Sequence, residues 1–230
     1  MSTPAEVFAA ARVILLDFDG PTAHLFAGNP ARAVADELAA QFHNAGIPLP
    51  DDADEYGPPE LSAELMRRSP DRADTVEALL AAAEIRAADT AEPTPGCREM
   101  LVAARKAGRP VVIVSNNSAD AIRMYLNHHQ LADLIADVVG RPWAAPDRTK
   151  PDPWPLHEAA RRQHVTAADC VLIGDSVTDI EAAQSAGAAS IGYANKPGKT
   201  ERLRHATALV DDMHDLADAL RSVPHLTPGA

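Results

Sequence analysis

The stretch V-I-L-L-D-F-D-G, residues 13–20, joins a short apolar run to two aspartates and a glycine. Its first four residues are a continuous run of branched apolar side chains, which is typical of a strand covered on both faces of a parallel sheet. Asp17 and Asp19 follow at once, and the dipeptide Gly20-Pro21 prevents the strand from continuing. Carboxylates are costly to bury, so two of them at the end of a buried strand need a chemical explanation.

Similar apolar runs recur along the chain and predict further strands, at 111–116, 171–176 and 189–193 and, more weakly, at 137–140 and 207–210. The segments between them have helical character, at 96–108, 118–130, 153–164 and 177–187. Strands and helices that alternate in this way predict an α/β fold with a doubly wound parallel sheet. In such sheets, ligands bind at the carboxyl ends of the strands.

Residues 24–95 interrupt this alternation, because they are alanine-rich, favour helices and contain no convincing strand. The segment is much longer than an ordinary connection. We therefore expect residues 1–23 and 96–230 to form a Rossmann-like core, and residues 24–95 to form a small α-helical cap. Ordinary crossover helices are the alternative.

Polar side chains follow several of the predicted strands; they are Asp17, Asp19, Ser115, Asn116, Asp175 and, after a longer loop, Lys150. Because the carboxyl ends of parallel strands share one edge, we expect these side chains to converge. Neighbouring carboxylates raise one another's pKa unless a cation lies between them, and all-oxygen ligands favour a hard ion such as Mg²⁺. A magnesium ion, a lysine and a serine hydroxyl together describe a phosphate site, in which an ionised aspartate can attack phosphorus.

Each segment alone also has an ordinary explanation, as a turn, a helix N-cap or an extended loop. Found together and in this order, the segments are far more specific than any one of them alone. The motifs D-F-D-G (17–20), Ser115 after V-V-I-V, K-P-D-P (150–153) and G-D-S-V-T-D (174–179) occur in this order, each near a strand end. Together they resemble the haloacid dehalogenase-like (HAD) superfamily of hydrolases, specifically its phosphatases. The long first gap is similar to that of members with a helical cap inserted between the first two motifs.

The resemblance implies an enzyme that forms an aspartyl-phosphate. Asp17 would be the nucleophile, and Asp19 would protonate the leaving oxygen and then activate water. Dehalogenating members lack an acid at the second position because a halide leaves without a proton. An alkoxide needs one, so Asp19 favours hydrolysis of a phosphate ester. A phosphoglycolate-like acid or a sugar phosphate is the kind of substrate that the resemblance suggests.

The resemblance also assigns the binding residues. Ser115 and Lys150 would hold the transferring phosphoryl group, with Asn116 nearby. A second set would bind Mg²⁺, namely Asp17, the backbone carbonyl of Asp19, and Asp175. Asp179 lies one helical turn after Asp175 and would reach back toward Lys150 or a metal-bound water.

The first motif departs from the pattern of the family, which continues Gly-Thr-Leu and then carries an acid. Here Pro21 follows the glycine and His24 replaces the acid, so Thr22 would supply the missing hydroxyl after a shift of one residue. A phosphomutase on the same core and a non-catalytic sensor or interaction subunit are alternative functions. Two further patterns are weaker. Ser176 together with Asp211 and His214 imitates an esterase, and G-Y-A-N-K-P-G-K-T (192–200) nearly matches a phosphate-binding loop.

The composition limits the possible partners. The 230 residues carry a formal net charge of −12, which argues against a nucleic-acid partner or an anionic membrane surface. No apolar segment reaches the length of a membrane span, and two cysteines make no disulfide framework. We expect a cytoplasmic monomer or homodimer that binds a small phosphorylated metabolite. Five arginines of the expected cap could bind a second anion or could be solvated, at positions 32, 67, 68, 72 and 86.

Overall fold

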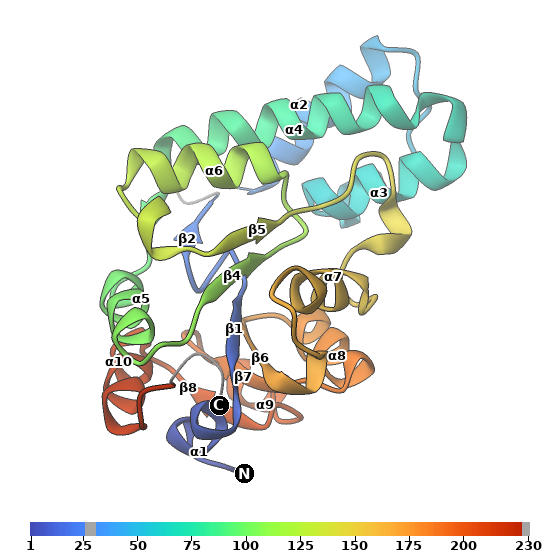
Figure 1. The fold of residues 1–230 in the computed structure, drawn as a ribbon. Coiled ribbons are helices and arrows are strands. Elements are labelled where there is room, and N and C mark those ends of the chain that lie inside the picture. Colours follow the sequence, from blue (N-terminus) through green and yellow to red (C-terminus); the bar gives the residue numbers. More distant parts are fainter. Residues whose placement is uncertain (26–30, 227–230) are drawn as a thin grey trace.

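A six-stranded parallel sheet in the order β5-β4-β1-β6-β7-β8 forms the centre of the computed structural model (Figure 1). The model describes residues 1–25 and 31–226, and side chains for residues 1–25 and 33–226; residues 26–30 of the expected cap lie outside the described residues. The strands are β1 (Val13–Leu16), β4 (Val111–Val114), β5 (Asp137–Val139), β6 (Cys170–Gly174), β7 (Ala189–Tyr193) and β8 (Ala208–Val210). The predicted α/β fold with a parallel sheet is confirmed.

Helices cover both faces of the sheet, as expected for a doubly wound fold. One face carries α1 (Pro4–Ala10), α5 (Cys97–Lys106), α6 (Ala119–His128) and α10 (Met213–Ser222), and the other carries α7 (Trp154–Arg162) and α8 (Val177–Ala186). Alternate residues of β1 serve the two layers: Ile14 and Leu16 pack in the first apolar cluster, whereas Val13 and Leu15 pack in the second. This burial on both sides explains the unbroken apolar runs in the sequence.

The strand ends bring the polar motifs into line. Leu16 at the end of β1 is in register with Ile113 of β4 and with Ile173 of β6. Asp17, Ser115 and Asp175 each follow directly after one of these strands. The sequence motifs therefore reach the same edge of the sheet.

A helical insertion lies beyond that edge and has an apolar cluster of its own (Figure 1). It consists of α2 (Ala31–Asn44), α3 (Pro58–Arg68) and α4 (Ala73–Thr90). Short 3-10 turns occur here and in the core loops, at Ala53–Glu55, Pro70–Arg72, Ala132–Leu134, Pro146–Arg148 and Ala167–Asp169, and a one-turn helix α9 spans Lys199–Arg202. The end of α4 leaves the insertion's cluster, since Ala87 and Ala88 pack in the main core.

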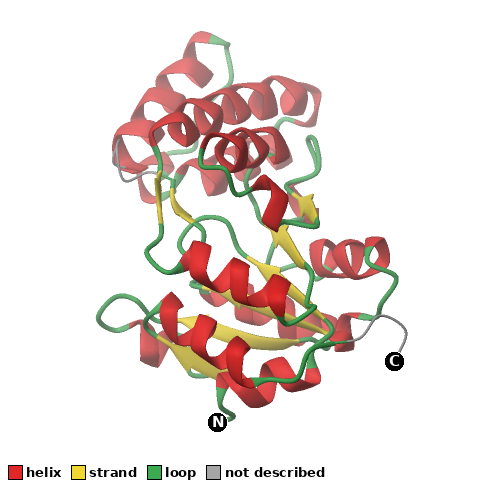
Figure 2. Cartoon of the chain, turned by 60° about the vertical axis from the view of Figure 1, so that its left-hand side comes forward, coloured by secondary structure: helices red, strands yellow, loops and turns green. Residues whose placement is uncertain are grey.

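The expectation that residues 24–95 contain no strand is wrong at both ends of the segment. β2 (Ala23–His24) and β3 (Glu92–Pro93) pair antiparallel and connect the insertion to the core (Figure 2). Two residues per strand are too few to produce a periodic pattern, so the sequence could not reveal this ribbon. His24 lies opposite Glu92 in it.

Among the described helices, none has the length and apolar character needed to cross a membrane.

Candidate active site

Lys150 occupies the centre of the polar edge. Its Nζ lies 2.7 Å from Asp17 Oδ1 and 2.6 Å from Asp179 Oδ1, and it also donates to the backbone carbonyl of Val114 at 3.1 Å. Lys150, Asp17 and Asp179 are all buried. The ammonium group has three donors, and each has an acceptor, so the side chain is held in one position between two carboxylates.

Asp179 is fixed from the other side by the start of α8. Its Oδ2 accepts from the backbone N–H of Asp175 at 3.1 Å and from that of Ser176 at 3.0 Å, while the Ser176 hydroxyl completes a capping box. Gly174 makes room for this carboxylate, because an added Cβ would lie 2.3 Å from Asp179 Cγ. The final acid of the G-D-S-V-T-D motif thus joins the helix cap to Lys150.

The charges at this edge are not balanced by Lys150 alone. Burial raises the pKa of Asp17 to about 8, and the negative charge of Asp179 acts in the same direction, against the opposing effect of Lys150. Burial alone would lower the pKa of Lys150, but Asp17 and Asp179 outweigh it and keep the ammonium charged. One cation shared between buried carboxylates leaves an excess of negative charge that a metal ion would offset.

The donor set fits such an ion. Asp17, Asp175 and Asp179 each offer a carboxylate oxygen, and these three atoms lie within 4.8 Å of one another. Carboxylate oxygens are ligands for hard divalent cations. The sequence predicted Asp17, the backbone carbonyl of Asp19, and Asp175 as the metal ligands, with Asp179 just behind them; the structure groups the carboxylates of Asp17, Asp175 and Asp179.

Asp19 lies beside this cluster but faces a different partner. Its Oδ1 accepts from the backbone N–H of Leu25 at 3.0 Å. Burial raises the pKa of the Asp19 carboxyl, and the negative charge of Asp175 contributes further. A carboxyl group that retains its proton more readily than usual is suited to donating it.

The unusual turn after Asp19 is built from short contacts. The hydroxyl of Thr22 donates to the backbone carbonyl of Asp17 at 2.7 Å, which fits the expected shift of a hydroxyl by one residue. Gly20 has a φ of +108°, and an added Cβ would lie 2.4 Å from Asp175 Cγ. The turn therefore requires glycine at this position for both reasons.

The second motif is organised around two asparagines. The carboxamide of Asn116 bonds both backbone groups of Lys150, accepting from its N–H at 2.8 Å and donating to its carbonyl at 2.9 Å. The hydroxyl of Ser115 donates to Asn117 Oδ1 at 3.0 Å. Asn116 thus connects the loops of the second and third motifs, and Asn117 holds Ser115.

A buried ion network connects this motif to the insertion. Glu84 of α4 accepts from Asn117 Nδ2 at 3.0 Å and from the backbone N–H of Ser118 at 2.9 Å. Arg141, in the loop after β5, reaches both Glu77 and Glu84, with N···O distances of 2.7 and 2.9 Å. Glu84 of α4 therefore contacts the core two and three residues after Ser115, and Glu77 contacts it through Arg141.

Lys199 is a further cation at the site. Its Nζ contacts Asp175 Oδ2, and the side chain is largely covered. The sequence contains only four lysines, and two of them, Lys150 and Lys199, pair with acids of the expected metal cluster. The sequence analysis did not assign Lys199 to the site; the rarity of lysine in this chain is the signal that could have pointed to it.

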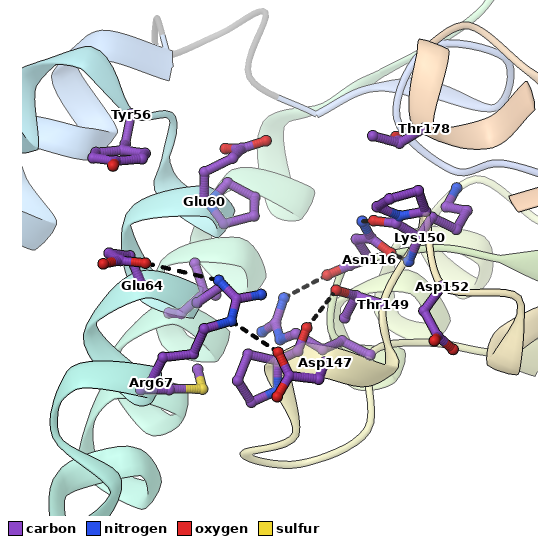
Figure 3. Close-up of a pocket in the computed structure, with 17 residues that line it drawn as sticks. Tyr56, Glu60, Glu64, Arg67, Asn116, Asp147, Thr149, Lys150, Asp152 and Thr178 are labelled. Atoms are coloured by element: carbon purple, nitrogen blue, oxygen red, sulfur yellow. Dashed lines mark hydrogen bonds and ion pairs between the residues drawn. The ribbon is translucent and has the colours of Figure 1, made fainter. Parts of the chain in front are cut away.

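Two adjoining hollows open between this edge and the insertion. One has a volume of about 280 Å³, and its lining includes Asp17, Asp19, Ser115 and Asp175 on the core side. The other has a volume of about 520 Å³ and lies between α3 and the loop before Lys150 (Figure 3). Asn116, Lys150 and Thr178 line both hollows, together with Pro59 and Glu60 of α3. The acids at the strand ends therefore face a space that the insertion helps to enclose.

Comparisons with known proteins agree with this arrangement. A sequence model of the family described as haloacid dehalogenase-like hydrolase matches residues 11–187. A phosphoglycolate phosphatase of Photobacterium profundum is 30% identical over 128 residues, which cover 55% of this chain and 55% of that protein. The match therefore spans about half the length of this curated relative.

Solved structures share the fold over most of the chain. A hydrolase from Pseudomonas syringae is 23% identical with a TM-score of 0.68, and the alignment covers 90% of this chain and 97% of that one. CbbY from Rhodobacter sphaeroides, solved in complex with phosphate, is 18% identical with a TM-score of 0.66, at coverages of 90% and 96%. Both resemble this chain through the insertion as well as through the sheet.

Proposed function

This chain belongs to the haloacid dehalogenase-like hydrolase family, and from that premise we propose that it is a Mg²⁺-dependent phosphatase that hydrolyses a small phosphomonoester through an aspartyl-phosphate. The observation that carries the proposal is the position of Asp17. It ends a buried strand, lines the hollow with Ser115, and has Lys150 Nζ 2.7 Å from its Oδ1. A nucleophile, a phosphate-binding cation and a metal-binding acid cluster thus share one space.

In the first step, a carboxylate oxygen of Asp17 attacks phosphorus, and the bond from phosphorus to the leaving alkoxide breaks. Asp19 donates its proton to that alkoxide, so a neutral alcohol departs. The raised pKa of the Asp19 carboxyl supports this assignment. In the second step, Asp19 takes a proton from water as the water attacks phosphorus, which releases inorganic phosphate and restores Asp17.

The remaining side chains bind and orient. Lys150 and Ser115 would hold the phosphoryl oxygens, and Asn116 would contribute by fixing the loop of Lys150. Asp17, the backbone carbonyl of Asp19, and Asp175 would hold Mg²⁺, which would supply positive charge to the phosphoryl group. Asp179 would orient Lys150 from behind.

The proposal includes the division of the chain. Residues 1–23 and 96–230 would form the catalytic core, and residues 24–95 the cap that encloses the substrate. The separate apolar cluster of α2, α3 and α4 supports this division. A small phosphorylated metabolite in a cytoplasmic setting is the partner we propose, and a phosphoglycolate-like acid and a sugar phosphate are the two candidate classes.

Hydrolysis of 4-nitrophenyl phosphate by the full chain tests the proposal. We expect turnover that requires added Mg²⁺ and that Asp17→Asn lowers by at least ~10⁴-fold, since an amide cannot serve as the nucleophile. A retained circular dichroism spectrum would show that the variant folds. Wild-type turnover by Asp17→Asn would contradict the nucleophile, and full turnover after exhaustive chelation would contradict the metal. Phosphate transfer to a sugar without release would identify a phosphomutase instead.

A further inference from the structure

The insertion forms an unusual wall of the smaller hollow, the one that Asp17 lines. The first turn of α3, with the sequence G-P-P-E at residues 57–60, lines the hollow that Asp17 and Ser115 line from the other side. A helix N-terminus usually attracts anions through its free backbone N–H groups. Here Pro58 and Pro59 occupy the first two helical positions and have no N–H to offer. Two of the backbone donors that an anionic ligand would use at this helix start are therefore missing.

Glu60 adds a negative charge to the same wall. It is exposed and lines both hollows, and no hydrogen bond or ion pair of its carboxylate occurs among the described residues. Figure 3 shows its carboxylate directed from α3 toward the side that carries Thr178. A substrate held at Asp17 would share this hollow with the Glu60 carboxylate.

The described cations that line the two hollows are already paired. Arg67 of α3 lies 2.8 Å from Asp147 Oδ1 and 3.9 Å from Glu64 Oε2. Arg141 is held by the buried carboxylates of α4, and Lys150 by the catalytic acids. Lys196, whose positive charge acts on Asp19, is not among the residues that line either hollow. The exposed charge that the insertion leaves unpaired beside the substrate is therefore the carboxylate of Glu60.

We propose that the leaving group of the substrate is an alcohol that carries a hydroxyl or an ammonium group, with Glu60 accepting its hydrogen bond. The structure disfavours a leaving group that carries a carboxylate, such as that of phosphoglycolate. Like charges within one partly enclosed hollow repel, and neither proline of the α3 turn offers a donor that would compensate. This inference rests on the proposed phosphatase function and narrows its substrate class.

Three phosphate esters of similar length test the inference with the full chain and Mg²⁺. They are ethylene glycol monophosphate, which carries a hydroxyl, phosphoethanolamine, which carries an ammonium, and 2-phosphoglycolate, which carries a carboxylate. We expect kcat/KM to be at least about tenfold higher for the first two than for the third. Glu60→Gln should reduce the ratio of phosphoethanolamine to 2-phosphoglycolate by about tenfold, and Glu60→Lys should invert it. Comparing ratios within each variant cancels any general change in activity.

Glu55→Gln is the matched control, because Glu55 is also an exposed glutamate of the insertion but lines neither hollow. Its ratio should equal that of the wild type. An equal or higher kcat/KM for 2-phosphoglycolate in the wild type overturns the inference, and so does a ratio that Glu60→Gln leaves unchanged. In either case turnover of 4-nitrophenyl phosphate preserves the phosphatase proposal. Failure to hydrolyse all three esters also overturns the inference, and failure to hydrolyse 4-nitrophenyl phosphate as well overturns both proposals.

Discussion

Among the described residues, two arginine contacts join the insertion to the core, and they differ in nearly every physical respect. On the α4 side, Arg141 meets Glu77 and Glu84 with all three side chains at most 4% exposed. On the α3 side, Arg67 meets Asp147 with side-chain exposures of 47% and 81%. The first contact continues into the core through Asn117 and Ser118, whereas the second lies at the rim of the larger hollow.

This difference indicates that the α4 side attaches the insertion to the core, whereas the α3 side is available for a ligand. A buried and fully bonded ion network holds one relative position of α4 and the core, because a shift would leave charges without partners away from water. The α3 side has hollows in place of such a network, so the side chains there are free to meet a substrate. The same insertion thus has a fixed side at α4 and, at α3, a proposed binding side.

The largest expected effect on stability comes from breaking the ion network on the fixed side. Arg141→Met leaves Glu77 and Glu84 buried without their cation, which should cost about 3–5 kcal/mol of folding free energy. For a chain of this length that corresponds to a melting temperature lower by about 6–20 °C. Thermal unfolding followed by circular dichroism measures it. A melting temperature within about 1 °C of the wild type would show that the network contributes nothing to stability.

A second comparison distinguishes the roles of the two glutamates of α4 in stability and in activity. Glu77→Gln and Glu84→Gln each place an amide NH₂ against donors and should each cost about 2–3 kcal/mol of stability. Only Glu84 also holds Asn117, which accepts from the hydroxyl of Ser115. We therefore expect Glu84→Gln alone to lower kcat/KM for 4-nitrophenyl phosphate, by about tenfold. Equal kcat/KM values for the two variants would refute a role of α4 in positioning Ser115.

The two sides also differ in how well the sequence predicts them. The strands and the acids at their ends were predictable because a buried parallel strand leaves an unbroken apolar run, and the motif follows directly after it. Asp17, Ser115 and Asp175 are found in this way. Asp179 was predictable from helical spacing, one turn after Asp175.

The contacts between the insertion and the core were not predictable in the same way. Arg141 lies 64 residues from Glu77 along the chain, and neither residue belongs to a local pattern. A buried glutamate on an alanine-rich helix looks like an exposed one until its partner is known. The arginines at 67, 68, 72 and 86, considered as binders of a second anion, each pair with a carboxylate; the side chain of Arg32 lies outside the described residues.

The ion pair between Lys199 and Asp175 has intermediate burial, and removing it should have a smaller effect, on the affinity for Mg²⁺. Lys199, with its side chain 14% exposed, contacts Asp175 and competes there with the proposed Mg²⁺. Lys199→Met should therefore tighten Mg²⁺ binding about tenfold, or about 1.4 kcal/mol. Isothermal titration calorimetry on the full chain measures the affinity directly, without substrate. Lys106→Met, an exposed lysine of α5, is the control, and an affinity that is equal in the two variants would contradict the competition.

Breaking the contact between Arg67 and Asp147, on the binding side, should have the smallest effect on stability. Arg67→Met removes a contact between two exposed side chains, which contributes about 0.2–1 kcal/mol at most because water and salt screen it. The melting temperature should fall by no more than about 4 °C, and the loss should shrink further in high salt, whereas the loss in Arg141→Met should persist. Thermal unfolding of both variants at low and high salt measures this difference. If Arg67→Met destabilised the chain as much as Arg141→Met, the α3 side would be as firmly attached as the α4 side, and the hollow between α3 and the core would be a rigid cavity with no freedom to adapt to a substrate.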